Sequence, residues 1–365
     1  MTAMVYFFIF FLFLFFCLLF IHFSGCSSSN LAFSKRYNLV FLFIPFSVLA
    51  FLMGFRHEVG ADYWNYLLIF ERFEANDAFI INRFEPGFLA ILNIVSSLEL
   101  NGNFFLFICY LFTVLFFWGG IYYSRFDSVS MISLSVILFL GIGPVFSATN
   151  TVRQSLPISI VIFIITFLSK RKKIATILSS AIGFLFHYSA PLVLVFNFVP
   201  TKSLGFKFWL FVSFFCVLLS SELMSFVFSF LQANRVFLGD FSGYFDGGGA
   251  FRESSGLGLR LVLEIIIFLF LSLYVKKINP KGLWFFNIAF FGILLAYVFR
   301  DYAMFLRGAS YFSVFKILAI PWFLKAFKGL EKQIFFFGFT VYSLSAFARS
   351  ATADQFAPFK IYFFS

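Results

Sequence analysis

Residues 153–173 read RQSLPISIVIFIITFLSKRKK, and this stretch decides the fold class. The run between Arg153 and the basic cluster at 170–173 carries no charge, and it has the length and apolar character of a helix that crosses a lipid bilayer. Positively charged residues are retained on the cytoplasmic side of a membrane. We therefore expect a spanning helix over 153–169, with the cluster inside and Arg153 at the outer mouth.

The composition of the whole chain agrees with this interpretation. Of the 365 residues, 62% are apolar, 24% aromatic and 12% charged, whereas soluble domains contain about 45–50% apolar and about 25% charged residues. These values exclude soluble globular, disordered, collagen-like, disulfide-scaffold and soluble nucleic-acid-binding proteins. The predicted class is an all-α, polytopic integral membrane protein with no nucleic-acid partner.

Hydropathy divides the chain into about ten full transmembrane helices. We expect them over residues 4–23, 38–53, 103–122, 130–147, 153–169, 207–230, 259–275, 283–299, 307–324 and 333–348. The first is expected to remain as an uncleaved helix, although Phe23-Ser24-Gly25-Cys26 weakly resembles a lipoprotein cleavage site. The sequence has no internal repeat and no soluble domain, so residues 1–365 are expected to form a single membrane domain.

Residues 174–198 lie between two basic clusters and therefore must begin and end inside. They predict a broken, re-entrant hairpin of two short helices that turns near His187-Tyr188-Ser189 and is interrupted by Pro191. Such breaks at membrane depth are tolerated where they line a polar cavity.

The basic residues are distributed unevenly. Clusters assigned to the inside hold 15 of the 27, and most of these are Lys, whereas the remainder are mostly Arg. Because a guanidinium binds phosphate or carboxylate with two parallel hydrogen bonds, this excess predicts an anionic ligand outside. The alternative is that these arginines pair with acidic residues of the outer loops.

This topology places both termini outside and leaves two long outer loops, at about 54–101 and 231–258. The first loop contains seven of the 16 acidic residues. Its short apolar stretch Phe88-Leu89-Ala90-Ile91-Leu92 is expected to lie in the membrane interface or to dip in from outside.

Candidate site residues lie beside the outer ends of the spans. If residues after Gly60 are helical, Asp62 and Tyr66 share one face and put a carboxylate beside an aromatic ring, with Tyr63 next to them. Helix capping is the alternative interpretation for Asp62, and it is also the alternative for Glu85, which precedes Pro86.

Arg153 begins a helix where the backbone dipole is already positive, which is unfavourable unless an anion is bound there. His187 lies at the turn of the predicted hairpin, a poor place to bury a histidine. Arg300, Arg307 and Tyr311 would face one cavity if they shared a continuous helix. No histidine or cysteine has metal-ligand spacing, so no metal is expected.

The order of these elements resembles the EpsG-like family of Wzy-type polysaccharide polymerases. The resemblance runs from about residue 50 to the C-terminus. It rests on Gly60-Ala61-Asp62-Tyr63 with Tyr66, Glu85-Pro86-Gly87-Phe88, Arg153-Gln154-Ser155-Leu156, His187-Tyr188-Ser189-Ala190, Arg307 with Tyr311-Phe312, and Ala357-Pro358-Phe359-Lys360. Pro157 stands where a plain helix former is expected, and the first span carries none of these motifs.

The resemblance implies a GT-C-like helical bundle that polymerises oligosaccharide repeat units linked to undecaprenyl diphosphate, at the outer face of the bacterial inner membrane. We expect the diphosphate to be bound by Arg56, Arg153, Arg300 and Arg307, and the glycan by Tyr63, Tyr66, Gln154 and Tyr311. The catalytic candidates are Asp62, Glu85 and His187, which the sequence does not rank.

The expected partners are the lipid-linked glycan, the bilayer, a flippase and a chain-length regulator. No cofactor is needed, because the lipid diphosphate is itself the leaving group. The alternatives are a transporter or flippase of lipid-linked glycans and an O-antigen-ligase-like transferase.

Overall fold

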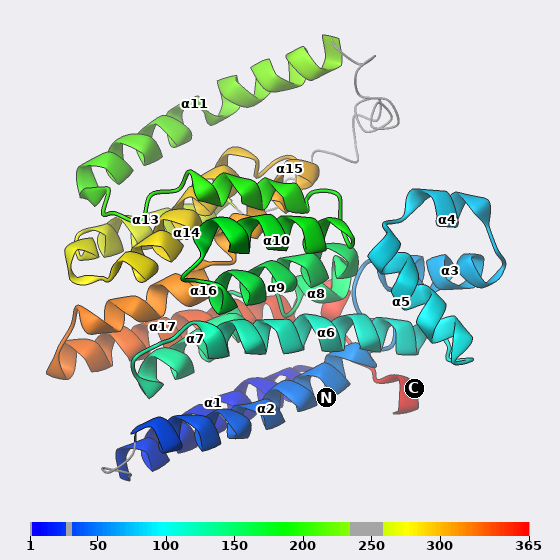
Figure 1. The fold of residues 1–365 in the computed structure, drawn as a ribbon, viewed down its shortest axis with the longest axis horizontal. Coiled ribbons are helices and arrows are strands. Elements are labelled where there is room, and N and C mark those ends of the chain that lie inside the picture. Colours follow the sequence, from blue (N-terminus) through cyan, green and yellow to red (C-terminus); the bar gives the residue numbers. More distant parts are fainter. Residues whose placement is uncertain (1, 27–30, 234–257, 365) are drawn as a thin grey trace. The chain divides into compact units, whose positions relative to one another are not determined.

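The computed structural model describes residues 2–26, 31–233 and 258–364. Over these ranges the regular structure is helical, with a single isolated β-bridge between Arg56 and Ile361 (Figure 1). The described residues form two compact units, of which the first contains those up to Asn197 and those from Ile320 onward. The second contains residues 198–319, and each unit is described by itself. The expectation of a single membrane domain stays a prediction.

The long helices of the first unit coincide with six predicted spans. They are α1 (Thr2–Cys26), α2 (Leu31–Gly54), α6 (Gly102–Tyr123), α7 (Val129–Gly141), α9 (Val152–Phe167) and α17 (Gly329–Ala351). α7 ends earlier than predicted, and the short helix α8 (Ser147–Asn150) follows it. α6 lies between α2 and α9, while α7 packs against α1 and α17 (Figure 1).

Small residues allow α6 to approach α9 closely. A Cβ atom added to Gly120 would collide with Ile162 Cγ2, and one added to Gly119 would lie 2.8 Å from the Phe163 ring. Such small residues let helix backbones come together in membrane proteins. The α6–α9 pair is therefore the tightly packed centre on which the other elements of this unit are placed.

The predicted outer loop at 54–101 is a helical layer rather than an open loop. It folds into α3 (Tyr63–Glu74), α4 (Ala78–Arg83) and α5 (Pro86–Ser97). Phe88, Ile91 and Leu92 are buried in a core shared with α6 and α9. The stretch supplies the hydrophobic face that attaches the layer to the bundle. Its expected position, in the membrane interface or dipping in from outside, stays a prediction.

Residues 172–197 form α10 (Lys172–Phe184) and the 3-10 helix η1 (Ala190–Asn197), joined by a turn that contains His187. The Thr176 hydroxyl donates a hydrogen bond to Asn197 Oδ1 at 2.8 Å, so the hairpin begins and ends at the same place. This agrees with the predicted path of the chain, while its re-entrant depth stays a prediction.

The second unit consists of α11 (Gly205–Ala233), α13 (Gly258–Ser272), η4 (Val275–Lys277), α14 (Pro280–Val298), α15 (Ala303–Ser313) and α16 (Lys316–Ala319). The predicted span 307–324 is broken, because α15 ends at Ser313 and η5 (Ile320–Lys325) follows α16. Pro321 has no N–H to donate to the carbonyl four residues before it, so it opposes a continuous α-helix here. Most of the predicted loop 231–258 lies outside the described residues.

Three of the described helices are long and apolar enough to cross a membrane by themselves. They are α6, α14 and α17, and several shorter apolar helices accompany them. The chain therefore has the character of a membrane protein, whereas the total of about ten full spans stays a prediction.

The second unit contains a buried cluster of charges that the sequence analysis did not identify. Lys316 Nζ lies 2.8 and 3.0 Å from the two carboxylate oxygens of Glu264, and Arg260 Nε lies 3.2 Å from Oε1 of the same carboxylate. Glu264 and Lys316 are 3% and 7% exposed. Charges in such a setting persist only when they are paired, so this cluster fixes α13 against α16.

Removal of one charge from this cluster should destabilise the protein strongly. We expect Lys316→Met to lower the free energy of unfolding by about 3–5 kcal/mol, because it leaves the buried Glu264 carboxylate without its closest partner. Thermal unfolding of the purified protein in detergent measures this. The double variant Glu264→Gln/Lys316→Met should recover part of the loss.

A matched control is Lys325→Met, because Lys325 pairs with Asp127 where both side chains are well exposed. An exposed ion pair contributes at most about 1 kcal/mol. Equal destabilisation by the two Lys→Met changes would contradict a structural role for the buried cluster.

Candidate functional site

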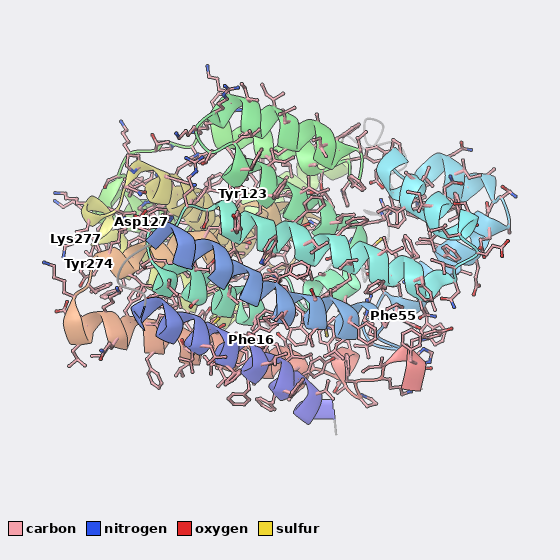
Figure 2. The ribbon with its side chains drawn as sticks, turned by 60° about the horizontal axis from the view of Figure 1, so that its bottom comes forward. Phe16, Phe55, Tyr123, Asp127, Tyr274 and Lys277 are labelled. Atoms are coloured by element: carbon pink, nitrogen blue, oxygen red, sulfur yellow. The ribbon has the colours of Figure 1, made fainter. Side chains whose placement is uncertain are left out.

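The candidate site residues of the first unit gather at one end of its helices. α2 ends there at Gly54, whereas α6 and α9 begin there after Asn101 and Thr151. Figure 2 shows Phe55 at this end, beside the C-terminal segment, and Tyr123 with Asp127 at the opposite end. The basic clusters around Arg125, Lys170–Lys173 and Lys325 follow the helix ends at that opposite side. The site and the clusters are therefore separated by the length of the bundle.

An ion pair between Arg153 and Glu85 forms the centre of this end. Arg153 Nη2 donates to Glu85 Oε1 at 3.0 Å, and the Glu85 side chain is 0% exposed while that of Arg153 is 27% exposed. The guanidinium carbon lies 4.5 Å from the centre of the Phe84 ring, an arrangement typical of cation–π contact. The anion that the helix N-terminus requires is thus supplied, in this structure, by the chain itself.

The ion pair leaves hydrogen-bonding capacity unused. Glu85 Oε2 and Arg153 Nε are both buried and have no hydrogen-bond partner among the described residues. Buried polar atoms are normally paired, so an unpaired donor and acceptor in one place indicate a site that is completed by something else. Because part of the guanidinium reaches the surface, the arrangement can hold an anion that shares Arg153 with Glu85.

The Glu85 motif and the His187 turn form one structure. The backbone N–H of Tyr188 donates to Glu85 Oε1 at 3.3 Å, and that of Gly87 donates to Leu185 O at 2.6 Å. A Cβ on Gly87 would lie 2.7 Å from the same carbonyl oxygen, so only glycine permits this approach. Glu85 precedes α5 but its side chain makes no capping bond, and its carboxylate serves the ion pair instead.

The hydrogen bonds of His187 determine which ring nitrogen carries the proton. The backbone N–H of Ser189 lies 3.2 Å from His187 Nδ1, and the Ser189 hydroxyl lies 2.9 Å from the same atom. A backbone N–H can only donate, so Nδ1 is the acceptor and the neutral imidazole carries its proton on Nε2. His187 is therefore a hydrogen-bond donor through Nε2 in this conformation.

Asp62 lies at the start of α3, as the sequence predicts. Its side chain makes no capping bond to the helix, and its nearest described partner is Asn65 Nδ2 at 3.4 Å from Oδ1. Structural capping, the alternative role for Asp62, is therefore absent here. The carboxylate is partly exposed and is available to a ligand.

The loop before Asp62 is fixed by residues far away in the sequence. Asn150 Oδ1 accepts from the Ala61 N–H at 2.9 Å, and Gln355 O accepts from the Gly60 N–H at 2.7 Å. Asn150 Nδ2 also donates to Gln355 Oε1 at 3.0 Å. Gly60 has a φ of +97° and a Cβ there would lie 2.6 Å from Asn150 Oδ1, so the position requires glycine.

The aromatic residues of α3 differ in exposure. Tyr63 and Tyr66 are 0% and 8% exposed, whereas Trp64 is 58% exposed. The Tyr66 hydroxyl lies 3.4 Å from the backbone N of Arg153 and supports the start of α9. Gln154 is also buried, at 4% exposure. The aromatic surface that α3 offers to a ligand is therefore Trp64, which the sequence analysis did not assign.

Arg56 is buried, and its guanidinium is bonded to backbone carbonyls. It is 0% exposed, and its guanidinium donates to Val59 O at 3.0 Å, Met53 O at 3.1 Å and Thr149 O at 2.7 Å. These bonds connect the end of α2, the following loop and α8. The guanidinium is occupied by backbone carbonyls, so in this conformation Arg56 holds the site together and does not face a diphosphate.

Arg300, Arg307 and Tyr311 belong to the second unit. The premise that they share a continuous helix was wrong, because α14 ends at Val298 and α15 begins at Ala303. Arg300 Nη1 donates to Tyr297 O at 3.0 Å and to Ser220 Oγ at 3.2 Å. Arg307 is exposed and Tyr311 is buried. Their participation in the site stays a prediction.

Comparison with known proteins identifies the family. The model of the EpsG family matches residues 39–363, which is most of the chain. The chain belongs to the EpsG family. This is a family of Wzy-like polysaccharide polymerases. No curated protein and no solved structure gives a match.

Five of the six motifs that carried the resemblance to the EpsG family meet in space within the first unit, whereas the Arg307 motif belongs to the second unit. Glu85 connects the Arg153 and His187 motifs, while Asn150 connects the Gly60 loop to Gln355. Lys360 of the last motif pairs with Glu58, and its carbonyl accepts from the His57 N–H at 2.9 Å.

Within the described residues, no group of three or more His, Cys, Asp or Glu could hold a metal ion.

Sequence reasoning missed the residues that hold these motifs in place, namely Asn103, Asn150 and Gln355. Each is an amide side chain, and nothing in its spacing distinguishes it from an ordinary polar residue. The available signal was proximity: Asn150 lies three positions before Arg153, and Gln355 two before Ala357.

Gly60→Ala should disturb the contacts of the Gly60 loop with Asn150 and Gln355. We expect the free energy of unfolding to fall by more than about 1 kcal/mol, because alanine disfavours a positive φ and its Cβ would collide with Asn150. Gly338→Ala in α17 is the matched control, since nothing lies within 4 Å of its Cβ. Thermal unfolding in detergent compares them, and equal stability of both variants would contradict the role of these contacts.

Proposed function

We propose that this EpsG-family protein polymerises lipid-linked oligosaccharide repeat units into a surface polysaccharide, with undecaprenyl diphosphate as the leaving group. The observation that carries the proposal is the Arg153–Glu85 pair. A partly exposed guanidinium lies at the N-terminus of α9, beside a buried carboxylate, and both groups retain unpaired polar atoms. A diphosphate can accept from the unpaired Arg153 N–H, and Glu85 Oε2 can accept from a hydroxyl of the attached sugar.

The electrostatics of the site favour an anion at Arg153. The N-terminus of a helix attracts negative charge through its free N–H groups and its dipole. Arg153 adds a permanent positive charge in a setting where Phe84 and Phe88 exclude water. Hydrogen bonds between a guanidinium and phosphate oxygens are short and strong. A diphosphate at this point would replace Glu85 at part of the guanidinium or bind to its unpaired N–H.

The proposed reaction is a single displacement at the anomeric carbon of the donor sugar. An oxygen lone pair of the acceptor hydroxyl forms the new glycosidic bond, and the bond between the anomeric carbon and the diphosphate oxygen breaks with its electrons going to the diphosphate. Arg153 neutralises the charge that develops on this leaving group. His187, whose neighbour Tyr188 donates its N–H to Glu85, is the further candidate for contact with the leaving group.

The contacts of the three predicted catalytic residues support a different role for each. Glu85 is committed to Arg153 and to the Tyr188 N–H, so we assign it to orienting the guanidinium. His187 carries its proton on Nε2 and serves the donor. Asp62 is partly exposed and does not cap α3. Of the three predicted residues, it is the one left to contact the acceptor hydroxyl.

The placement of charges supports an outer location for the reaction. The site lies at the end of the first unit opposite to the basic clusters, which the positive-inside rule assigns to the cytoplasm. On this basis we propose a multi-pass protein of the bacterial inner membrane with an extracytoplasmic site. A flippase would then supply the lipid-linked units, and a chain-length regulator would act on the product.

Reconstitution tests the function directly. The purified full-length protein is placed in liposomes with lipid-linked repeat units, and the products are separated by size. A ladder of polymers supports the proposal. Translocation of the units without new glycosidic bonds would instead identify a flippase, and transfer only to an added lipid A core would identify a ligase.

Arg153→Lys should reduce polymerisation on the order of 10²-fold while the fold is retained, because an ammonium cannot reproduce the bidentate contact to phosphate. Initial rates in liposomes measure the effect. Arg72→Lys is the matched control, since Arg72 forms an ion pair with Asp77 in the outer layer, where its side chain is 43% exposed. Similar rates for all three proteins would remove Arg153 from the proposal.

Glu85→Gln tests whether the carboxylate acts through Arg153. If Glu85 only orients the guanidinium, its substitution should lower the rate, and the double variant Glu85→Gln/Arg153→Lys should be no slower than Arg153→Lys alone. Strictly additive losses in this double-mutant cycle would show that Glu85 has an independent role.

A further inference from the structure

His57 is the centre of a hydrogen-bonded chain that the predicted site does not include. Its Nδ1 lies 3.1 Å from the Tyr63 hydroxyl, which donates to Asn103 Oδ1 at 2.7 Å. Tyr63 and Asn103 are buried, at 0% and 9% exposure, whereas the His57 side chain is 26% exposed. The chain thus runs from the interior of the α3–α6 contact to an imidazole at the surface.

This chain determines the tautomer of His57. A phenol has one proton, and Tyr63 uses it toward Asn103, so the contact with His57 requires Nδ1 to be the donor. Burial raises the pKa of the Tyr63 phenol to about 12, which keeps that proton in place at neutral pH. The neutral imidazole therefore carries its proton on Nδ1 and presents an unprotonated Nε2. His187 has the opposite tautomer.

The charged groups around His57 can stabilise a proton on Nε2. Glu58 Oε1 lies 4.0 Å from Nε2, and pairing with Lys360 lowers the pKa of the Glu58 carboxyl, so Glu58 is ionised at neutral pH. Tyr63 and Tyr362 also flank the imidazole, with ring centres 5.7 and 6.3 Å away, and the charge of the buried Arg56 acts on the Tyr63 phenol. An imidazole fixed by one partner and flanked by a carboxylate has the arrangement of a general base.

An exposed aromatic ring lies beside the imidazole. The ring centre of Trp64 is 6.4 Å from that of His57, and Trp64 is 58% exposed. Aromatic side chains with an apolar face and a polar edge suit sugar rings. A sugar stacked on this indole would lie beside the His57 imidazole.

We propose that His57 is the general base of the reaction, in place of Asp62, and that Trp64 holds the acceptor sugar whose hydroxyl it deprotonates. The inference rests on the proposed polymerase function. As the acceptor oxygen bonds to the anomeric carbon and the diphosphate departs with the bonding electrons, the hydroxyl proton passes to His57 Nε2. The resulting imidazolium faces Glu58 and later releases the proton to water.

The pH dependence of polymerisation in liposomes tests His57. The rate of the wild-type protein should fall on acidification, because a protonated imidazole cannot accept another proton. His57→Gln should lower the rate on the order of 10²-fold or more, and the remaining rate should no longer fall on acidification. Added imidazole should partly restore the activity of His57→Ala.

Substitution of neighbouring residues gives the controls. Tyr63→Phe removes the acceptor that fixes the tautomer and should give an intermediate rate. Tyr362→Phe makes the same chemical change at a ring beside His57 whose hydroxyl accepts from Asn101, and its rate should equal that of wild type. Trp64→Ala should raise the KM for the acceptor unit with little change in kcat.

The contrary outcomes are distinct. If the rate of His57→Gln still falls at acidic pH and the variant loses only thermal stability, His57 is structural and the inference fails. If instead Asp62→Asn abolishes the fall of the rate at acidic pH, the general base is Asp62. Failure of the wild-type protein to form polymer would reject the proposed function itself. The pH dependence of His57 modification by diethyl pyrocarbonate, read by mass spectrometry, still reports its protonation in that case, and a protonated ring at neutral pH would overturn the inference.

Discussion

The ion pair between Arg153 and Glu85 is the interaction on which the candidate site depends. It joins the start of α9 to the start of α5 and, through the Tyr188 N–H, to the turn after α10. A buried carboxylate without this partner would be strongly unfavourable, and a cation at the N-terminus of α9 without an anion would be unfavourable as well. Each charge is therefore acceptable only because the other is present, and the arrangement also presents a guanidinium edge to the surface.

The two histidines of the first unit illustrate how hydrogen bonds can give one residue type two roles. A backbone N–H directed at Nδ1 places the proton of His187 on Nε2, whereas the Tyr63 oxygen, whose own proton goes to Asn103, keeps the proton of His57 on Nδ1. One imidazole therefore carries its proton on Nε2 and the other on Nδ1. In the proposed reaction the two rings take opposite parts, one at the leaving group and one at the nucleophile.

Much of the fold was predictable from hydropathy, because a membrane helix is encoded by a local run of apolar residues. Hydropathy does not show what tertiary packing decides. Phe88–Leu92 is too short to span, and only the structure shows that Phe88, Ile91 and Leu92 pack against α6 and α9. Of the candidate site, the positions of Asp62, Glu85 and His187 followed from their motifs. The burial of Arg56 and the exposure of Trp64 did not, because the sequence does not specify which side of a short helix faces the bundle.

The pairing of Lys360 with Glu58 joins residues 302 positions apart, and it has a consequence for the order of assembly. During synthesis the loop that contains Gly60 leaves the ribosome long before Gln355 exists to accept its N–H. The loop therefore stays incompletely bonded until the segment around Gln355 and Lys360 has been made. A chain that stopped after α9 would carry the α2–α6–α9 group and still lack the contacts of Gln355 and Lys360 that shape this end of the bundle.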